Sequence, residues 1–139
     1  MRSQILGVTP LVSVFDMPEA IRFYRDILGF TIINSSPEIE APEGKYFRWA
    51  WLRLGEANLM LNTAYDAGQR PHSREISRWE GHADTCLYFG CADADQIYEE
   101  LIAKGVHLQP PANTHYGMRQ LYVHDPDGYN LYFQHPVRL

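Results

Sequence analysis

One pattern occurs twice in the chain, and this duplication restricts the fold more than any other feature. Each copy has an apolar strand-like segment, an aspartate that can cap a helix, an apolar helical stripe, a closing glycine and further strand-like segments. In this pattern Asp16 corresponds to Asp93, and Gly29 corresponds to Gly105. The spacing is much longer than the repeats of solenoid proteins. The sequence therefore predicts an α+β fold built from two βαβββ halves.

The expected elements follow from hydrophobic periodicity and from turn residues. The halves are expected over residues 5–63 and 82–136, as parts of one domain that covers residues 1–139, because one half alone could hardly cover its sheet. The polar segment between them is expected to be a linker with a helical turn near residues 75–80. Strands are expected at 6–15, 30–35, 46–54, 57–63, 85–91, 106–110, 118–124 and 129–135, with a loop at 36–44.

The composition argues against two classes of binding partner, nucleic acids and membranes. The chain has 139 residues and a formal charge of −5, and no cluster of Lys or Arg suggests a nucleic acid or an anionic membrane surface. No apolar run has the length of a signal peptide core or of a membrane span. We therefore expect a cytoplasmic protein without nucleic-acid or membrane partners. Cys86 and Cys91 have opposite parity on one expected strand, so we expect two reduced thiols.

Short motifs in both halves resemble a known family. They are Val14-Phe15-Asp16, Phe23-Tyr24 and Leu28-Gly29-Phe30 in the first half, and Asp125-Pro126-Asp127-Gly128 before the last strand. Their order and duplication are similar to those of the glyoxalase, bleomycin-resistance and extradiol-dioxygenase superfamily, which has the vicinal oxygen chelate fold. The resemblance implies a curved eight-stranded mixed sheet, helices outside, a cleft inside and, often, a homodimer.

Strand parity indicates which side chains line that cleft. Leu59, Leu61, Leu131 and Phe133 should pack beneath the helices, so their neighbours on the same strands should face the other way. The expected ligand-binding residues are Trp49, Trp51, Asn58, Met60, Asn62, Cys86, Tyr88, Tyr122, Asn130, Tyr132 and Gln134. Arg53 and Gln120 share the expected orientation, and Arg53 could hold an anionic group.

The resemblance also implies four positions at which metal-dependent members place their ligands. In this chain those positions are occupied by Thr9, Met60, Cys86 and Tyr132. Divalent metals of the kind used in such enzymes prefer imidazole and carboxylate ligands, and none of the four residues supplies one. The sequence therefore predicts no catalytic metal at the usual place and no other cofactor.

Two classes of function remain open. The first is a metal-free protein, similar to the bleomycin-resistance branch, that binds a flat aromatic or heterocyclic compound through aromatic and amide side chains. The alternative is a glyoxalase-type or dioxygenase-type lyase or oxidoreductase that acts on a small carbonyl or aromatic substrate, with displaced metal ligands or without a metal. Tyr132 and the loop residue His115 are then the candidates for acid–base work. The tryptophans could instead fill a core or a dimer interface.

Overall fold

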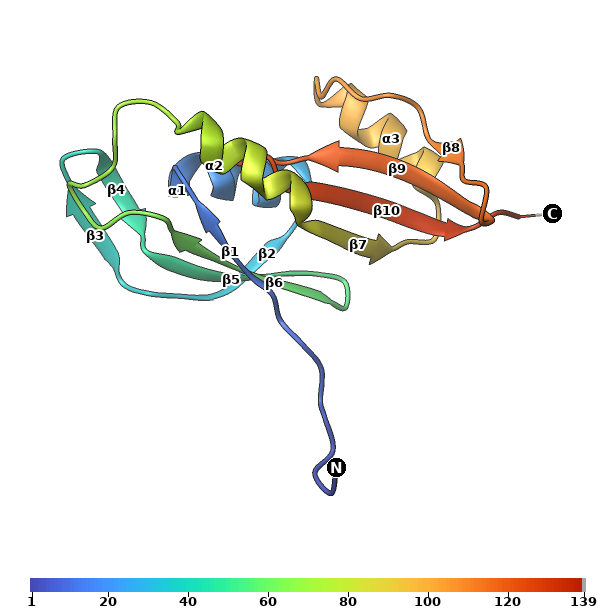
Figure 1. Cartoon of the computed structure of the whole chain (residues 1–139), viewed down its shortest axis with the longest axis horizontal. Coiled ribbons are helices and arrows are strands. Elements are labelled where there is room, and N and C mark those ends of the chain that lie inside the picture. The colour runs from blue at the N-terminus through green and yellow to red at the C-terminus, as the bar shows by residue number, and fades with distance from the viewer. Residues whose placement is uncertain (139) are drawn as a thin grey trace. The chain divides into compact units, whose positions relative to one another are not determined.

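The computed structural model describes residues 1–138 and shows two compact units, Met1–His72 and Ser73–Leu139 (Figure 1). Each unit contains one copy of the strand–helix–strands pattern, so the predicted α+β class and the βαβββ repeat are confirmed. Within residues 1–138 no helix has the length and apolar character needed to cross a membrane.

The first unit is a four-stranded mixed sheet with one helix. The strands have the order β1-β6-β5-β2, in which β1 is parallel to β6 and the other neighbours are antiparallel. A separate two-stranded ribbon, β3-β4, occupies most of the loop expected at 36–44 and the beginning of the strand expected at 46–54. The elements are β1 (Leu11–Val14), α1 (Met17–Ile21) continued by a π-helical segment (Arg22–Ile27), β2 (Thr31–Ser35), β3 (Glu38–Ala41), β4 (Gly44–Phe47), β5 (Trp49–Leu54) and β6 (Ala57–Thr63).

The second unit repeats this plan. Its sheet has the order β7-β10-β9-β8, and again the first strand is parallel to the last while the remaining pairs are antiparallel. The expected helical turn in the preceding linker is confirmed as α2. The elements are α2 (Ile76–Gly81), a 3-10 turn (His82–Asp84), β7 (Cys86–Gly90), α3 (Ala94–Ala103), β8 (Ala112–Asn113), β9 (Met118–His124) and β10 (Asn130–Pro136).

The two helices α1 and α3 begin and end as their residues predict. The Asp16 carboxylate accepts a hydrogen bond from the Glu19 amide, and the Asp93 carboxylate accepts one from the Gln96 amide, both at 3.1 Å. These caps satisfy amides that have no partner within the helix. Gly29 and Gly105 follow the helices with φ values of 93° and 88°, a conformation that favours glycine.

The core of each unit lies between its helix and one face of its sheet. In the first unit the alternate side chains of β1, β5 and β6 are buried with those of α1, and the rings of Tyr24 and Phe30 meet edge to face at 5.6 Å. In the second, α3 is tied to β9 by an Asp95–Arg119 ion pair of 2.7 Å. The buried residues include Val12, Val14, Ala20, Tyr24, Phe30, Ala50, Leu52, Leu59, Leu61, Ala94, Leu101, Leu121, Val123, Leu131 and Phe133.

The expected strand at residues 106–110 is wrong. The chain there forms no ladder, and β8 is a two-residue strand that pairs only with Gln120 and Arg119. Pro110 and Pro111 explain the difference, because proline has no backbone N–H to donate to a neighbouring strand. As a result, β9 has a ladder partner on its outer side only near its beginning.

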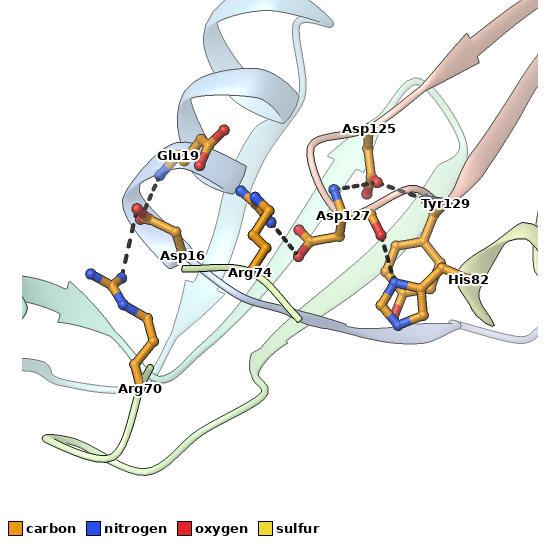
Figure 2. Close-up of polar contacts among 8 residues, drawn as sticks. All are labelled: Asp16, Glu19, Arg70, Arg74, His82, Asp125, Asp127 and Tyr129. Atoms are coloured by element: carbon orange, nitrogen blue, oxygen red, sulfur yellow. Dashed lines mark hydrogen bonds and ion pairs between the residues drawn. The ribbon is translucent and has the colours of Figure 1, made fainter. Parts of the chain in front are cut away.

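The linker helix α2 belongs to the second unit. Arg74 forms a 3.1 Å ion pair with the buried Asp127, and His82 Nδ1 donates a 2.6 Å hydrogen bond to the Asp127 carbonyl (Figure 2). The His82 ring also stacks on Tyr129, with ring centroids 4.0 Å apart. The turn between β9 and β10 is thus held from outside by the linker, while Asp125 organises it from within by accepting from two backbone amides.

The first unit has its own contact between the linker and a helix cap. Arg70 lies 3.6 Å from the Asp16 carboxylate that caps α1 (Figure 2). The Arg70 guanidinium also lies over the Phe15 ring. Glu43 accepts hydrogen bonds from the Tyr46 hydroxyl and from the Gly68 amide. These contacts hold residues 68–70 against the ribbon and the start of α1.

Candidate functional site

The face of the first sheet that is turned away from its core carries aromatic, amide and cationic side chains. The pairing of β5 with β6 sets them in three rows, with Trp49 opposite Asn62, Trp51 opposite Met60 and Arg53 opposite Asn58. Directly opposed residues share a face, and their neighbours Ala50, Leu52, Leu59 and Leu61 are fully buried on the other one. We call these six residues the indole face.

Asn58 orders one end of the indole face. Its Oδ1 accepts hydrogen bonds from Trp51 Nε1 and from Arg53 Nε, both at 3.0 Å, and the Arg53 guanidinium lies 5.7 Å from the Trp51 ring centroid. At the other end, the Trp49 indole N–H and the side-chain amide of Asn62 have no hydrogen-bond partner within residues 1–138. These half-buried polar groups are available to a ligand.

The corresponding face of the second sheet is built from tyrosines and neutral polar groups. Register places Tyr88 opposite Tyr132 and Tyr132 opposite Tyr122, and the rings contact one another with centroids 4.8 Å and 5.2 Å apart. Tyr88 and Tyr122 are 55% and 44% exposed, so their outer faces are open to a ligand. We call this set the tyrosine face: Cys86, Tyr88, Gln120, Tyr122, Asn130, Tyr132 and Gln134.

Hydrogen bonds fix the polar groups around these rings. The Tyr122 hydroxyl donates to Asn130 Oδ1 at 2.5 Å, and Asn130 Nδ2 donates to the Ala83 carbonyl. Gln120 Nε2 donates to Gln134 Oε1 and to the Tyr116 hydroxyl. Tyr116 was not among the predicted residues, because it lies in the turn before β9, where strand parity gives no information.

The two residues proposed for acid–base work differ in their surroundings. Burial, and then the nearby Cys86 and tyrosine hydroxyls, raise the pKa of Tyr132, so its hydroxyl is suited to donate a hydrogen bond and unsuited to act as a phenolate base. His115 lies exposed in the β8–β9 turn, where its ring meets Tyr116 edge to face. No hydrogen bond within residues 1–138 joins His115 to a carboxylate that could orient it.

An open hollow of about 550 Å³ lies beside β9 in the second unit. Tyr122 belongs both to its lining and to the tyrosine face, so a molecule on the face can extend into the hollow. Sequence reasoning missed this feature, because it followed from the failure of residues 106–110 to form a strand. The lining consists of Ile102, Gly105, Val106, His107, Leu108, Gln109, Tyr122 and His124.

The four positions at which the family resemblance implies metal ligands, Thr9, Met60, Cys86 and Tyr132, have an unsuitable donor set in this chain. In the first unit, Met60 pairs with Leu11, two residues after Thr9, and in the second, Cys86 and Tyr132 lie on the adjacent strands β7 and β10. A thioether, a thiol, an alcohol and a protonated phenol do not match the imidazole and carboxylate donors that catalytic Mn²⁺, Fe²⁺ or Ni²⁺ sites require. We therefore derive no metal-dependent step from this set.

Comparisons with known proteins agree with the fold. The chain is 28% identical over 127 residues to a lactoylglutathione lyase of Haemophilus influenzae, with 88% of this chain and 87% of the relative covered. The crystal structure of TnmS3, described as an antibiotic binding protein from Streptomyces sp. CB03234, matches with 24% identity and a TM-score of 0.68, covering 98% of this chain and 100% of the other.

TioX from Micromonospora sp. ML1 is similar in structure, with 19% identity, a TM-score of 0.68 and coverage of 94% of this chain and 100% of the other. Structural similarity at this level of sequence identity shows that the fold is shared. The sequence model of one family, however, matches residues 6–133, nearly the whole chain. The protein therefore belongs to the Glyoxalase/Bleomycin resistance protein/Dioxygenase superfamily.

Proposed function

We propose that the protein binds a flat aromatic or heterocyclic small molecule without using a catalytic metal, in the manner of the bleomycin-resistance branch of its superfamily. The observation that carries this proposal is the tyrosine face, where the Tyr132 ring contacts Tyr88 on one side and Tyr122 on the other, and amides with fixed hydrogen bonds border the rings. Exposed rings offer stacking surface, and fixed amides give a ligand its orientation. The description of TnmS3 as an antibiotic binding protein supports the same class of function.

We propose ligand contacts for the indole face and for the tyrosine face, each within its own unit, and we propose that the chain acts as one domain. Tyr132 is central to the tyrosine face, since its ring contacts both Tyr88 and Tyr122. Its raised pKa keeps the hydroxyl protonated at neutral pH, which suits donation to a ligand carbonyl or ring nitrogen. We further propose a cytoplasmic homodimer, for which light scattering that reports a monomer at micromolar concentration would be contrary evidence.

A thermal-shift screen with flat polycyclic compounds tests the proposed function. A ligand that binds the native state raises the melting temperature in proportion to its concentration. Replacement of Tyr132 by Ala should then weaken the best hit by about tenfold, since one aromatic contact contributes about 0.5–1.5 kcal/mol beyond its buried area.

The matched control is Tyr98→Ala, which removes the same side chain from α3, away from the tyrosine face. The proposal fails if no flat compound stabilises the protein, or if Tyr132→Ala binds the best hit as tightly as the parent does.

A lyase activity is the second candidate, favoured by the 28% identity to the Haemophilus lactoylglutathione lyase. In that reading the Tyr132 hydroxyl or the His115 imidazole moves a proton on a small carbonyl substrate. A turnover assay with lactoylglutathione and with the methylglyoxal–glutathione hemithioacetal decides between the candidates. Turnover that disappears in Tyr132→Phe or in His115→Ala would favour the enzyme over the binding protein.

A further inference from the structure

The indole face of the first unit contains one positively charged side chain, the exposed Arg53. No carboxylate within residues 1–138 lies at ion-pair distance from Arg53, although the chain as a whole is acidic, with a formal charge of −5. Surface arginines need no special explanation when they point freely into solvent. Arg53 instead has a fixed place in a row of the indole face, opposite Asn58 on the neighbouring strand.

Two contacts orient the Arg53 guanidinium. Its Nε donates to Asn58 Oδ1 at 3.0 Å, and its central carbon lies 5.7 Å from the Trp51 ring centroid. The same Asn58 oxygen accepts from Trp51 Nε1, so a single amide holds both the indole and the guanidinium. No hydrogen bond within residues 1–138 uses the terminal nitrogens of Arg53, which leaves the fork that binds carboxylates available.

The rows of the indole face place an aromatic surface beside this cation. Trp49, Trp51 and Arg53 alternate along β5, and successive rows of a strand face lie about 7 Å apart. A ligand with two fused rings and an acidic substituent can therefore lie against the Trp51 and Met60 row while its acid reaches Arg53. The guanidinium is oriented in advance, so less conformational freedom is lost when the acid binds.

We propose that Trp51, Arg53 and Asn58 form a recognition site for the carboxylate of a flat aromatic ligand, so that the protein selects anionic aromatics over neutral ones of the same shape. This inference rests on the proposed small-molecule binding function and defines its ligand class. Trp51 contacts the ring, Arg53 pairs with the carboxylate, and Asn58 is a positioning residue that keeps the other two in place.

Calorimetric titration with 2-naphthoate and with its neutral counterpart 2-naphthamide tests the site. The parent protein should bind the carboxylate at least about tenfold more tightly, because a hydrogen bond to a charged group contributes more than a neutral one. Arg53→Gln should abolish this preference while leaving 2-naphthamide binding nearly unchanged. Asn58→Asp should also abolish it, since the new carboxylate pairs with the guanidinium, and Arg53→Lys should retain part of it.

Arg22→Gln is the matched control. It removes one arginine charge from the same unit at an exposed position of the helical segment and should leave the preference intact. Equal binding of both probes by the parent protein, or a carboxylate preference that survives in Arg53→Gln, would overturn this inference and leave the proposed function standing. If neither probe binds the parent protein, the inference is contradicted, and the thermal-shift screen with flat polycyclic compounds decides separately whether the proposed function stands.

Discussion

The indole face and the tyrosine face are built on the same strand plan but carry different chemistry. In both units the strand before the last pairs antiparallel with the last strand, and alternate residues face away from the core. On these two strands the first unit presents two indoles, one guanidinium, a thioether and two amides, whereas the second presents two tyrosines and neutral amides, with the third tyrosine, Tyr88, on the neighbouring β7. The repeat thus preserves which positions are presented, while the residues at those positions have diverged.

The turns that join the last two strands also differ between the two units, in how closely other atoms approach their glycines. Gly55 in the β5–β6 turn has a φ of 58° and open space where a Cβ would lie. Gly128 in the β9–β10 turn has a φ of 84°, and a Cβ there would lie 2.7 Å from the Trp79 carbonyl oxygen. The linker helix α2 therefore packs closely against the β9–β10 turn, whereas a Cβ at Gly55 would meet no neighbouring atom. Three predictions test such differences between the units.

Replacement of Gly128 by Ala should have the largest effect. The new Cβ meets both an unfavourable backbone conformation and the Trp79 backbone, so we expect a loss of about 4 kcal/mol in the free energy of unfolding. Chemical denaturation measures this loss. Gly55→Ala is the control, with an expected loss of about 1–2 kcal/mol from conformation alone. Equal losses in the two variants would show that Trp79 does not restrict the turn.

Replacement of Asp125 by Ala should have the next largest effect. The buried Asp125 carboxylate accepts 2.9 Å hydrogen bonds from the Asp127 and Tyr129 amides, and its removal leaves two buried donors without this partner. We expect a loss of about 2 kcal/mol in denaturant unfolding.

The exposed Glu56 of the first turn is the comparison, and Glu56→Ala should change stability by less than about 0.5 kcal/mol. A loss in Asp125→Ala no larger than that in Glu56→Ala would contradict the role assigned to the Asp125 carboxylate.

The smallest expected effect is a change in alkaline stability confined to the first unit. Burial, and then the hydrogen bond to Glu43, raise the pKa of Tyr46 from 10 to about 12. Because the folded state holds this proton more tightly than the unfolded state, its stabilising contribution is complete below pH 10 and is lost as the pH rises through 12.

Hydrogen exchange should therefore show Tyr46 and its neighbours in β3 and β4 becoming less protected over this pH range. Tyr46→Phe should remove that pH dependence, and exchange in β9 and β10 should not follow it. An unchanged alkaline profile in Tyr46→Phe would rule out this hydroxyl as the cause.

Much of the fold could be predicted from sequence because its signals are local. The capping aspartates, the glycines after the helices and the alternation in β6 and β10 each act within a few residues, so Asp16, Gly29 and Leu131 identify their own structural roles. The strand at residues 106–110 was predicted from its apolar pattern, but whether a strand forms also depends on backbone donors. Pro110 and Pro111 lack those donors, and their effect was underestimated.

The candidate site was less predictable. Parity identified the residues that share a face, including Trp51, Arg53 and Tyr132, since that depends only on strand alternation. It could not show that Asn58 holds two partners at once, because this requires side-chain positions across two strands. Nor could it find the hollow beside β9, which depends on residues 106–110 not pairing with that strand.

The assignment of the linker helix to the second unit has a consequence for gene architecture. Every strand pairing within residues 1–138 lies on one side of the junction between His72 and Ser73, and Arg74, Trp79 and His82 contact the turn at Asp127 and Gly128 in the later half. A rearranged coding sequence that places the later half first would therefore keep each strand ladder within one half. It would also keep the contacts of Arg74, Trp79 and His82 with the β9–β10 turn. The strand ladders alone therefore do not fix the order of the two halves along the chain.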